Sequence, residues 1–106
     1  MLGPMMIRLF HCDDSDAMRL LVREQFAGHE RVEVVGGAHD PSTALHGAAD
    51  VQPDVVLLDL LDPEHADALV IELRAVVPAA RIAHGGADAY VEKSAPFDVL
   101  ERAVLG

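Results

Sequence analysis

Three aspartates and one lysine end apolar stretches of the sequence, and together they could carry out metal or phosphoryl chemistry. Asp13 and Asp14 follow "IRLFHC", Asp59 follows "VVLL", and Lys93 follows "AYVE". Three carboxylates at close range repel one another unless something neutralises them. A hard divalent cation with oxygen ligands, above all Mg²⁺, would do so, and so would the ammonium of Lys93.

Such a pocket suits a phosphoryl group, because a cation and an ammonium balance its charge while a carboxylate attacks in line. Aspartates at strand ends are also common as helix caps and turn formers, so each of these residues has a structural interpretation. The functional hypothesis therefore depends on the four residues as a set, together with the elements that bring them to one place.

Alternating strands and helices are predicted to position these residues. Strands are predicted at Ile7–Cys12, "VEVVG" (32–36), "DVVLLD" (54–59), "RIAH" (81–84) and "AYVE" (89–92). Helices are predicted from Ser15 to Gly28, from Asp40 to about Ala49, from Pro63 to Pro78, and over "APFDVLERAVLG" (95–106). They follow from apolar spacing of i, i+3, i+4 and from capping residues and prolines at their ends.

This alternation predicts one α/β domain over residues 1–106 with an open parallel sheet. In such sheets, sites lie beyond the carboxyl ends of the strands, where the strand order reverses. If the first and third strands are neighbours, Asp13, Asp14 and Asp59 converge in one crevice. The core should be aliphatic, because 51% of the residues are hydrophobic and only 4% are aromatic.

Composition and charge exclude several classes of function. The net charge of -10 argues against nucleic-acid binding by this domain, which needs a basic surface. No apolar run approaches the roughly 18 residues of a membrane span, and the start lacks the pattern of a signal peptide. A single cysteine, Cys12, excludes an internal disulfide and fits a reducing cytoplasm; within a strand it should be a buried, inert thiol.

With these motifs, the sequence resembles the receiver domain of two-component response regulators, especially receivers that precede LuxR-type (NarL-like) helix-turn-helix domains. The resemblance spans about Met6 to Leu105. It rests on Asp13-Asp14, the "PDVVLLDL" block around Asp59, Pro63, and "GADAYVEKSAP". It implies a flavodoxin-like (CheY-like) doubly wound parallel sheet with strand order 2-1-3-4-5, and a signalling module rather than an enzyme acting on another molecule.

The resemblance also implies a role for each site residue. Asp59 would accept a phosphoryl group from the phosphohistidine of a histidine kinase or phosphotransfer protein. Asp14 and Asp59 would bind Mg²⁺ directly, Asp13 mainly through water, and the backbone carbonyl of Leu61 would be a further ligand. Lys93 would pair with the phosphoryl group. Tyr90 fits the position of the aromatic residue that swings inward on activation.

The sequence departs from the family in the stretch "RIAHGGADAYVEK". The family places a Ser or Thr at the end of the fourth strand, and no Ser or Thr lies between Arg81 and Lys93. The segment after Pro63 reads "EHADA" where the family usually carries a glycine. The helix between the fourth and fifth strands is absent or unrecorded, although a parallel crossover takes about a dozen residues or more.

Three explanations for the short connection stay open. A stretch could be missing from the recorded chain, the deletion could be natural, or Gly85-Gly86 could form the turn of a hairpin that makes the sheet edge antiparallel. An apolar edge left without its helix would favour pairing with a second copy of the chain.

Two other functions compete with a phosphoacceptor receiver. The first is a pseudo-receiver, an interaction module that keeps the fold but does not switch by phosphorylation. The second is a small Mg²⁺-dependent phosphatase, which would need an acid-base Asp two residues after the nucleophile, where this chain has Leu61. The six histidines show no metal-ligand spacing, although His65 and His84 could lie near the pocket rim.

Overall fold

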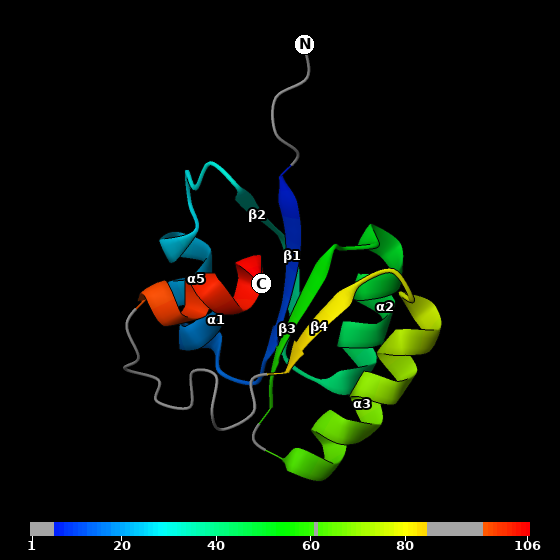
Figure 1. The fold of residues 1–106 in the computed structure, drawn as a ribbon. Helices are drawn as coiled ribbons and strands as arrows, with labels where there is room; N and C mark the ends of the chain where they lie inside the picture. The colour runs from blue at the N-terminus through cyan, green and yellow to red at the C-terminus, as the bar shows by residue number, and fades with distance from the viewer. Residues whose placement is uncertain (1–5, 61, 85–96) are drawn as a thin grey trace.

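In the part of the chain that the structure describes, a four-stranded parallel sheet carries helices on both faces (Figure 1). The computed structural model describes residues 6–60, 62–84 and 97–106. The strands are β1 (Ile7–Asp13), β2 (Val32–Ala38), β3 (Val55–Asp59) and β4 (Arg81–His84). The helices are α1 (Asp16–Gln25), α2 (Pro41–Val51), α3 (Pro63–Val76) and α5 (Phe97–Leu105).

The strand order is β2-β1-β3-β4, and every pairing is parallel. The order reverses between β1 and β3, so this is the switch point at which doubly wound sheets carry their sites. The predicted parallel α/β class and the first four strands of the predicted order are confirmed. The predicted fifth strand and the short connection at residues 85–96 lie outside the described residues.

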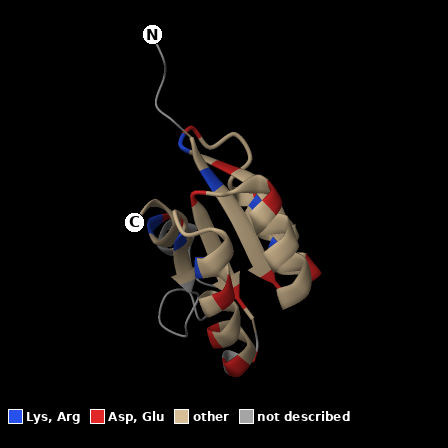
Figure 2. Ribbon diagram, turned by 90° about the vertical axis from the view of Figure 1, so that its right-hand side faces the viewer, with Lys and Arg blue, Asp and Glu red and all other residues tan. Residues whose placement is uncertain are grey.

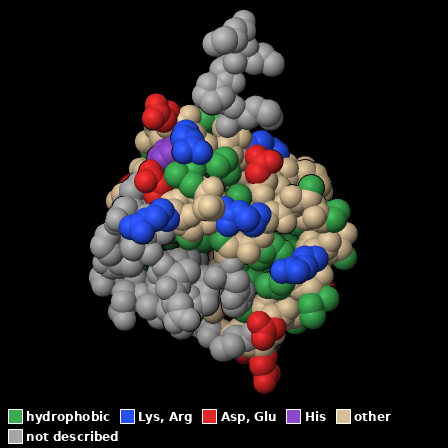
Figure 3. All heavy atoms as spheres, viewed as in Figure 1, with side chains coloured by type: hydrophobic (Ala, Val, Ile, Leu, Met, Phe, Trp, Pro, Cys, Tyr) green, Lys and Arg blue, Asp and Glu red, His purple; other side chains and the backbone are tan. Residues whose placement is uncertain are grey.

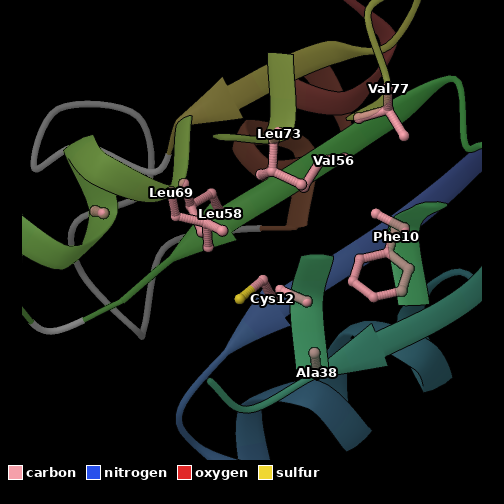
Figure 4. Close-up of a cluster of buried hydrophobic side chains, with 11 residues drawn as sticks. Phe10, Cys12, Ala38, Val56, Leu58, Leu69, Leu73 and Val77 are labelled. Carbon is pink, nitrogen blue, oxygen red and sulfur yellow. The ribbon is translucent and has the colours of Figure 1, made fainter. Parts of the chain in front are cut away.

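Two apolar layers cover the sheet, one on each face. Side chains on the α2–α3 side and on the α1–α5 side alternate along each strand, as the period of two in a strand requires. The α2–α3 layer, shown in Figure 4, contains Phe10, Cys12, Val56, Leu58, Leu69, Leu73 and Val77. The α1–α5 layer contains Leu9, Val22, Phe26, Val32, Val55, Leu57 and Val104.

Aspartate and serine caps begin the helices where the sequence predicts them. Ser15 Oγ accepts a hydrogen bond from the backbone N–H of Met18 at 3.2 Å. Asp40 Oδ1 accepts one from the N–H of Thr43 at 2.8 Å, and the side chain of Asp62 caps α3. These caps satisfy N–H groups that have no partner within a helix and so fix where each helix starts.

The face that α1 presents to the sheet is narrower than its apolar pattern indicates. Val22 and Phe26 are buried, but Leu21, which fits the same helical spacing, is 41% exposed. The sheet therefore covers only the stripe of the helix centred on Val22 and Phe26.

Acidic and basic residues are distributed unevenly over the surface. Figure 2 shows acidic residues at the end of the sheet to which the strand arrows point, among other places. On the face shown in Figure 3, the basic side chains stand apart, with acidic and hydrophobic groups between them. Among the described residues, no helix is long and apolar enough to cross a membrane.

Candidate functional site

Asp13 and Asp59 lie side by side at the carboxyl ends of β1 and β3. They are partners in the parallel register of these two strands, so both project from the same face of the sheet. Asp13 is fully buried, Asp59 is half-buried, and the adjacent Asp14 is exposed. The first and third strands are therefore neighbours, as the predicted site requires. Their pairing brings the three aspartates to one edge of the sheet.

Two groups at the start of α1 hold Asp13 in place. The backbone N–H of Ser15 donates a hydrogen bond to Asp13 Oδ1 at 2.8 Å. The guanidinium of Arg19 donates to the backbone carbonyl of Asp13 through Nη1 and pairs with Asp16 through Nη2. The Asp13 carboxylate is thus oriented before any ligand arrives.

His11 is a functional candidate that the sequence patterns do not single out. Its side chain is only 3% exposed, and its Nε2 lies 3.4 Å from Asp13 Oδ2. Neither ring nitrogen of His11 has a hydrogen-bond partner within the described part of the chain. The period of two that places Leu9 and Asp13 on one face of β1 also places His11 there, and this is the signal that could have identified it.

Cys12 lies on the opposite face of β1 and takes no part in this edge. Burial, followed by the charge of Asp13 and then of Asp40, raises the pKa of the Cys12 thiol from 9.0 to about 12. The thiol is fully buried in the α2–α3 layer. The prediction that it is buried is confirmed, and its raised pKa makes it a poor nucleophile.

The carboxylates are chemically suitable ligands for a hard divalent cation. Asp13, Asp14 and Asp59 offer oxygen ligands, which Mg²⁺ prefers, at one edge of the sheet. Across the described residues, however, no three His, Cys, Asp or Glu side chains are already grouped as metal ligands.

Several predicted site residues fall elsewhere. Leu61, Tyr90 and Lys93 lie outside the described residues, so their roles remain predictions. His65 is on α3 with its side chain 70% exposed, and its Nδ1 lies 3.3 Å from Asp62 Oδ2. Asp62 serves a structural purpose, since its Oδ1 accepts the N–H of Glu64 at 2.9 Å at the start of α3.

Comparisons with known proteins show which proteins this chain resembles. No family model matches the chain. The signal receiver domain of the response regulator NarL from Mycobacterium tuberculosis superposes with a TM-score of 0.75 at 27% identity, over 96% of this chain and 95% of that one. Over nearly its whole length, the chain is therefore similar in fold and sequence to the receiver domain of a response regulator.

Other comparisons agree. A LuxR-family two-component response regulator from Aurantimonas sp. SI85-9A1 matches with a TM-score of 0.65 at 26% identity, over 89% of this chain and 69% of that one. A protein-glutamate methylesterase/protein-glutamine glutaminase from Myxococcus xanthus is 42% identical over 57 residues, which are 54% of this chain. The match spans 16% of that relative's own length.

Proposed function

We propose that this receiver is a phosphoacceptor module of two-component signal transduction, in which Asp59 accepts a phosphoryl group from the phosphohistidine of a kinase or phosphotransfer protein. The observation that carries the proposal is the register pairing of Asp59 with Asp13 at the switch point of the sheet. Asp59 is half-buried, so an incoming phosphoryl group can reach it from solvent.

In the transfer, a carboxylate oxygen of Asp59 attacks the phosphorus, and an O–P bond forms as the N–P bond to the kinase imidazole breaks. The imidazole leaves with the electron pair of the broken bond and takes up a proton. Little other covalent chemistry is needed, so the task of the receiver is to position Asp59 and to balance charge.

Asp13, Asp14, Asp59 and the backbone carbonyl of Leu61 would hold Mg²⁺ in this proposal, with Asp13 acting mainly through water. When bound, the cation supplies positive charge against the phosphoryl oxygens. The contacts of Asp13 support its role, because the N–H of Ser15 holds the carboxylate and Arg19 holds the backbone carbonyl without help from the metal.

The remaining parts of the proposal extend beyond the described residues. Lys93 pairs with the phosphoryl group, and Tyr90 reports the phosphorylated state. Residues 1–106 form a single receiver domain that works in the cytoplasm, and it acts as the substrate of its kinase and catalyses its own phosphorylation, with no other substrate. A homodimer formed over the sheet edge is part of the same proposal.

A pseudo-receiver that binds partners without phosphorylation is the second candidate. The observation in its favour is the sequence from Arg81 to Lys93, which contains no Ser or Thr to hold a phosphoryl oxygen. β4 ends at His84, which is the register partner of Leu58. In the family, a Ser or Thr that holds the phosphoryl oxygen is expected at the end of this strand. In a pseudo-receiver, the fold and the aspartates at the end of the sheet would remain, but phosphorylation would no longer switch the domain.

Incubation with a small-molecule phosphodonor and Mg²⁺, followed by intact mass measurement, separates the two candidates. The phosphoacceptor proposal predicts a gain of one phosphoryl group that an Asp59→Asn variant lacks. An Asp67→Asn variant is the matched control, because Asp67 is exposed on α3 and has the same charge. Absence of any gain at millimolar Mg²⁺ would favour the pseudo-receiver.

A further inference from the structure

An open hollow lies at the end of the sheet opposite to the aspartates. It is formed where the chain passes from α1 to β2, at the end from which the strand arrows start (Figure 1). Its volume is about 390 Å³, and it is lined by Met6, Arg23 and residues 26–29 and 32–34. Pockets for ligands commonly have volumes of about 300 to 1,000 Å³, so the hollow has room for one.

The wall of the hollow is apolar. The side chains of Phe26 and Val32 are buried, and that of Val34 is half-buried. Met6 lines the same hollow from the start of β1 and is 36% exposed. An apolar group that entered the hollow would therefore cover side chains that now face water, and this burial would favour binding.

His29 is a fixed part of this wall. Its ring makes an edge contact with Phe26, with the ring centroids 5.5 Å apart. Its Nε2 lies 2.7 Å from Glu101 Oε2, and its Nδ1 accepts the backbone N–H of Arg31 at 3.0 Å. Both ring nitrogens already have partners, so the imidazole shapes the hollow but does not supply a group for a ligand.

The backbone of β2 borders the hollow as an edge strand. Among the described strands, β2 pairs only with β1. The carbonyl of Arg31 accepts the N–H of Ile7 at 2.7 Å, so it points toward β1. Backbone groups alternate in direction along a strand, and those of Val32 and Val34 therefore point away from β1. Outward groups of this kind can pair with a further extended chain.

Arg23 gives the hollow a positive charge. It lies in the last turn of α1, and its guanidinium has no ion pair or hydrogen bond within the described residues. An arginine at this position also complements the negative end of the helix dipole, which is its structural interpretation. Glu33 borders the hollow too, but Val32 and Val34 belong to the α1–α5 layer, so alternation places the Glu33 side chain on the other face. The charge beside the hollow therefore suits an anionic ligand.

We propose that the hollow binds the carboxyl-terminal residue of an extended peptide from a partner protein. An apolar terminal side chain fills the hollow, the terminal carboxylate pairs with Arg23, and the peptide backbone adds to the edge of β2 at Val32 and Val34. Addition of a strand to a sheet edge, with a pocket for a side chain, is a general mode of peptide recognition. The inference goes beyond the proposed phosphoacceptor function and does not depend on Asp59.

The experiment is an NMR titration of the isotope-labelled protein with an acetylated tetrapeptide, Thr-Val-Thr-Leu, that has a free carboxyl terminus. We expect saturable binding with a dissociation constant below about 1 mM. The amide signals that move should be those of Gly28, Val32 and Val34 and not those of Asp13 and Asp59.

Altered peptides test each contact without any change in the protein. The carboxamide form cannot pair with Arg23, so it should bind at least about threefold more weakly. Methyl groups on the nitrogens of the two inner amides prevent hydrogen bonds to β2 and should weaken binding by at least about the same factor. Replacement of the terminal leucine by glycine leaves the hollow empty and should remove saturable binding.

Three variants of the protein complete the test. Arg23→Met should lower the affinity for the free-acid peptide to that of the carboxamide. Arg31→Met is the matched control, because Arg31 is exposed and has the same charge but does not line the hollow; its affinity should stay within about twofold. Ala27→Trp, at an exposed position of the lining, should block the hollow and abolish binding.

Absence of saturation up to about 1 mM peptide would overturn the inference, and so would equal affinities of the wild-type protein for the acid and the carboxamide. Equal losses in Arg23→Met and Arg31→Met, or signal changes confined to Asp13 and Asp59, would assign the peptide to another surface and equally overturn it. Asp59→Asn should bind the peptide like the wild type, so the inference stands or falls separately from the proposed function.

Discussion

Asp13 and Asp59 are register partners at the carboxyl ends of two adjacent parallel strands, although they come from opposite halves of the first sixty residues. One is fully buried and the other half-buried, so the pair joins the interior of the sheet to its solvent edge. Two like charges in this position need a counter-charge, which Mg²⁺ supplies in the phosphoacceptor proposal.

Magnesium should stabilise the protein through this edge. At a Mg²⁺ concentration about 100 times the dissociation constant, mass action raises the free energy of unfolding by about 2.7 kcal/mol. We expect the exposed Asp14, changed to Asn, to remove most of that increment, because one direct ligand is lost. Urea unfolding with and without Mg²⁺ measures it. An Asp67→Asn control should retain the full effect, and equal Mg²⁺ stabilisation in the Asp14 variant would count against the site.

Arg19 should contribute to stability by anchoring the end of β1. It donates to the backbone carbonyl of Asp13, and its side chain is 24% exposed. Hydrogen bonds to charged groups contribute about 1.5 to 3 kcal/mol, so with partial exposure Arg19→Met should cost about 1 to 2 kcal/mol in urea unfolding. Arg23→Met, one turn further along α1 and exposed, should cost less than about 0.5 kcal/mol. Equal losses in the two variants would show that the anchoring contact is not important.

Alkaline pH should destabilise the protein through Cys12. Burial raises the pKa of this thiol from 9.0 to about 12. Below the lower value the thiol is neutral in both states, and above it only the unfolded state loses the proton. The free energy of unfolding should therefore fall by about 1.4 kcal/mol between about pH 8 and pH 10.

Cys12→Val isolates this effect from other groups that titrate in the same range. The difference in stability between the wild-type and Cys12→Val proteins should widen in favour of the variant as the pH rises. Parallel stability profiles, measured by urea unfolding at each pH, would contradict the assignment.

Gly47 on α2 should be needed for the packing of Phe10. A Cβ atom at position 47 would lie 2.9 Å from Cε2 and Cζ of the Phe10 ring, which is only 2% exposed. Gly47→Ala gains about 1 kcal/mol of helix propensity, but overpacking a core costs about 1 to 3 kcal/mol. We expect a net loss of about 1 kcal/mol in thermal or urea unfolding.

The sign of the Gly47→Ala effect should reverse when the ring is removed. In a Phe10→Leu background the added methyl group has room, so the helix propensity term alone should remain, a gain of about 1 kcal/mol. A double-mutant cycle measures the coupling directly. If Gly47→Ala destabilises both backgrounds equally, the close approach to Phe10 is not the cause.

Much of the fold could be predicted from local patterns. The apolar runs ending at Cys12 and Asp59 predicted two buried strands, and Asp40 with Pro41 predicted the start of α2, because caps and periodicity are encoded within a few residues. The exposure of Leu21 could not be predicted, since the pattern does not say how wide a stripe the sheet covers.

The sequence by itself determined the elements, their parallel arrangement and the aspartates that end them, since these depend on short-range spacing and chain connectivity. The residue patterns left open whether β1 lies beside β3, which the family resemblance implied and the structure confirms. Only the tertiary structure decided that Asp13 is buried while Asp14 is exposed, and that Arg19 and His11 contact Asp13. Strand periodicity fixes the face on which a side chain lies but not its neighbour across the sheet. That neighbour is chosen by pairing between distant segments, which minimises exposed apolar surface for the whole chain.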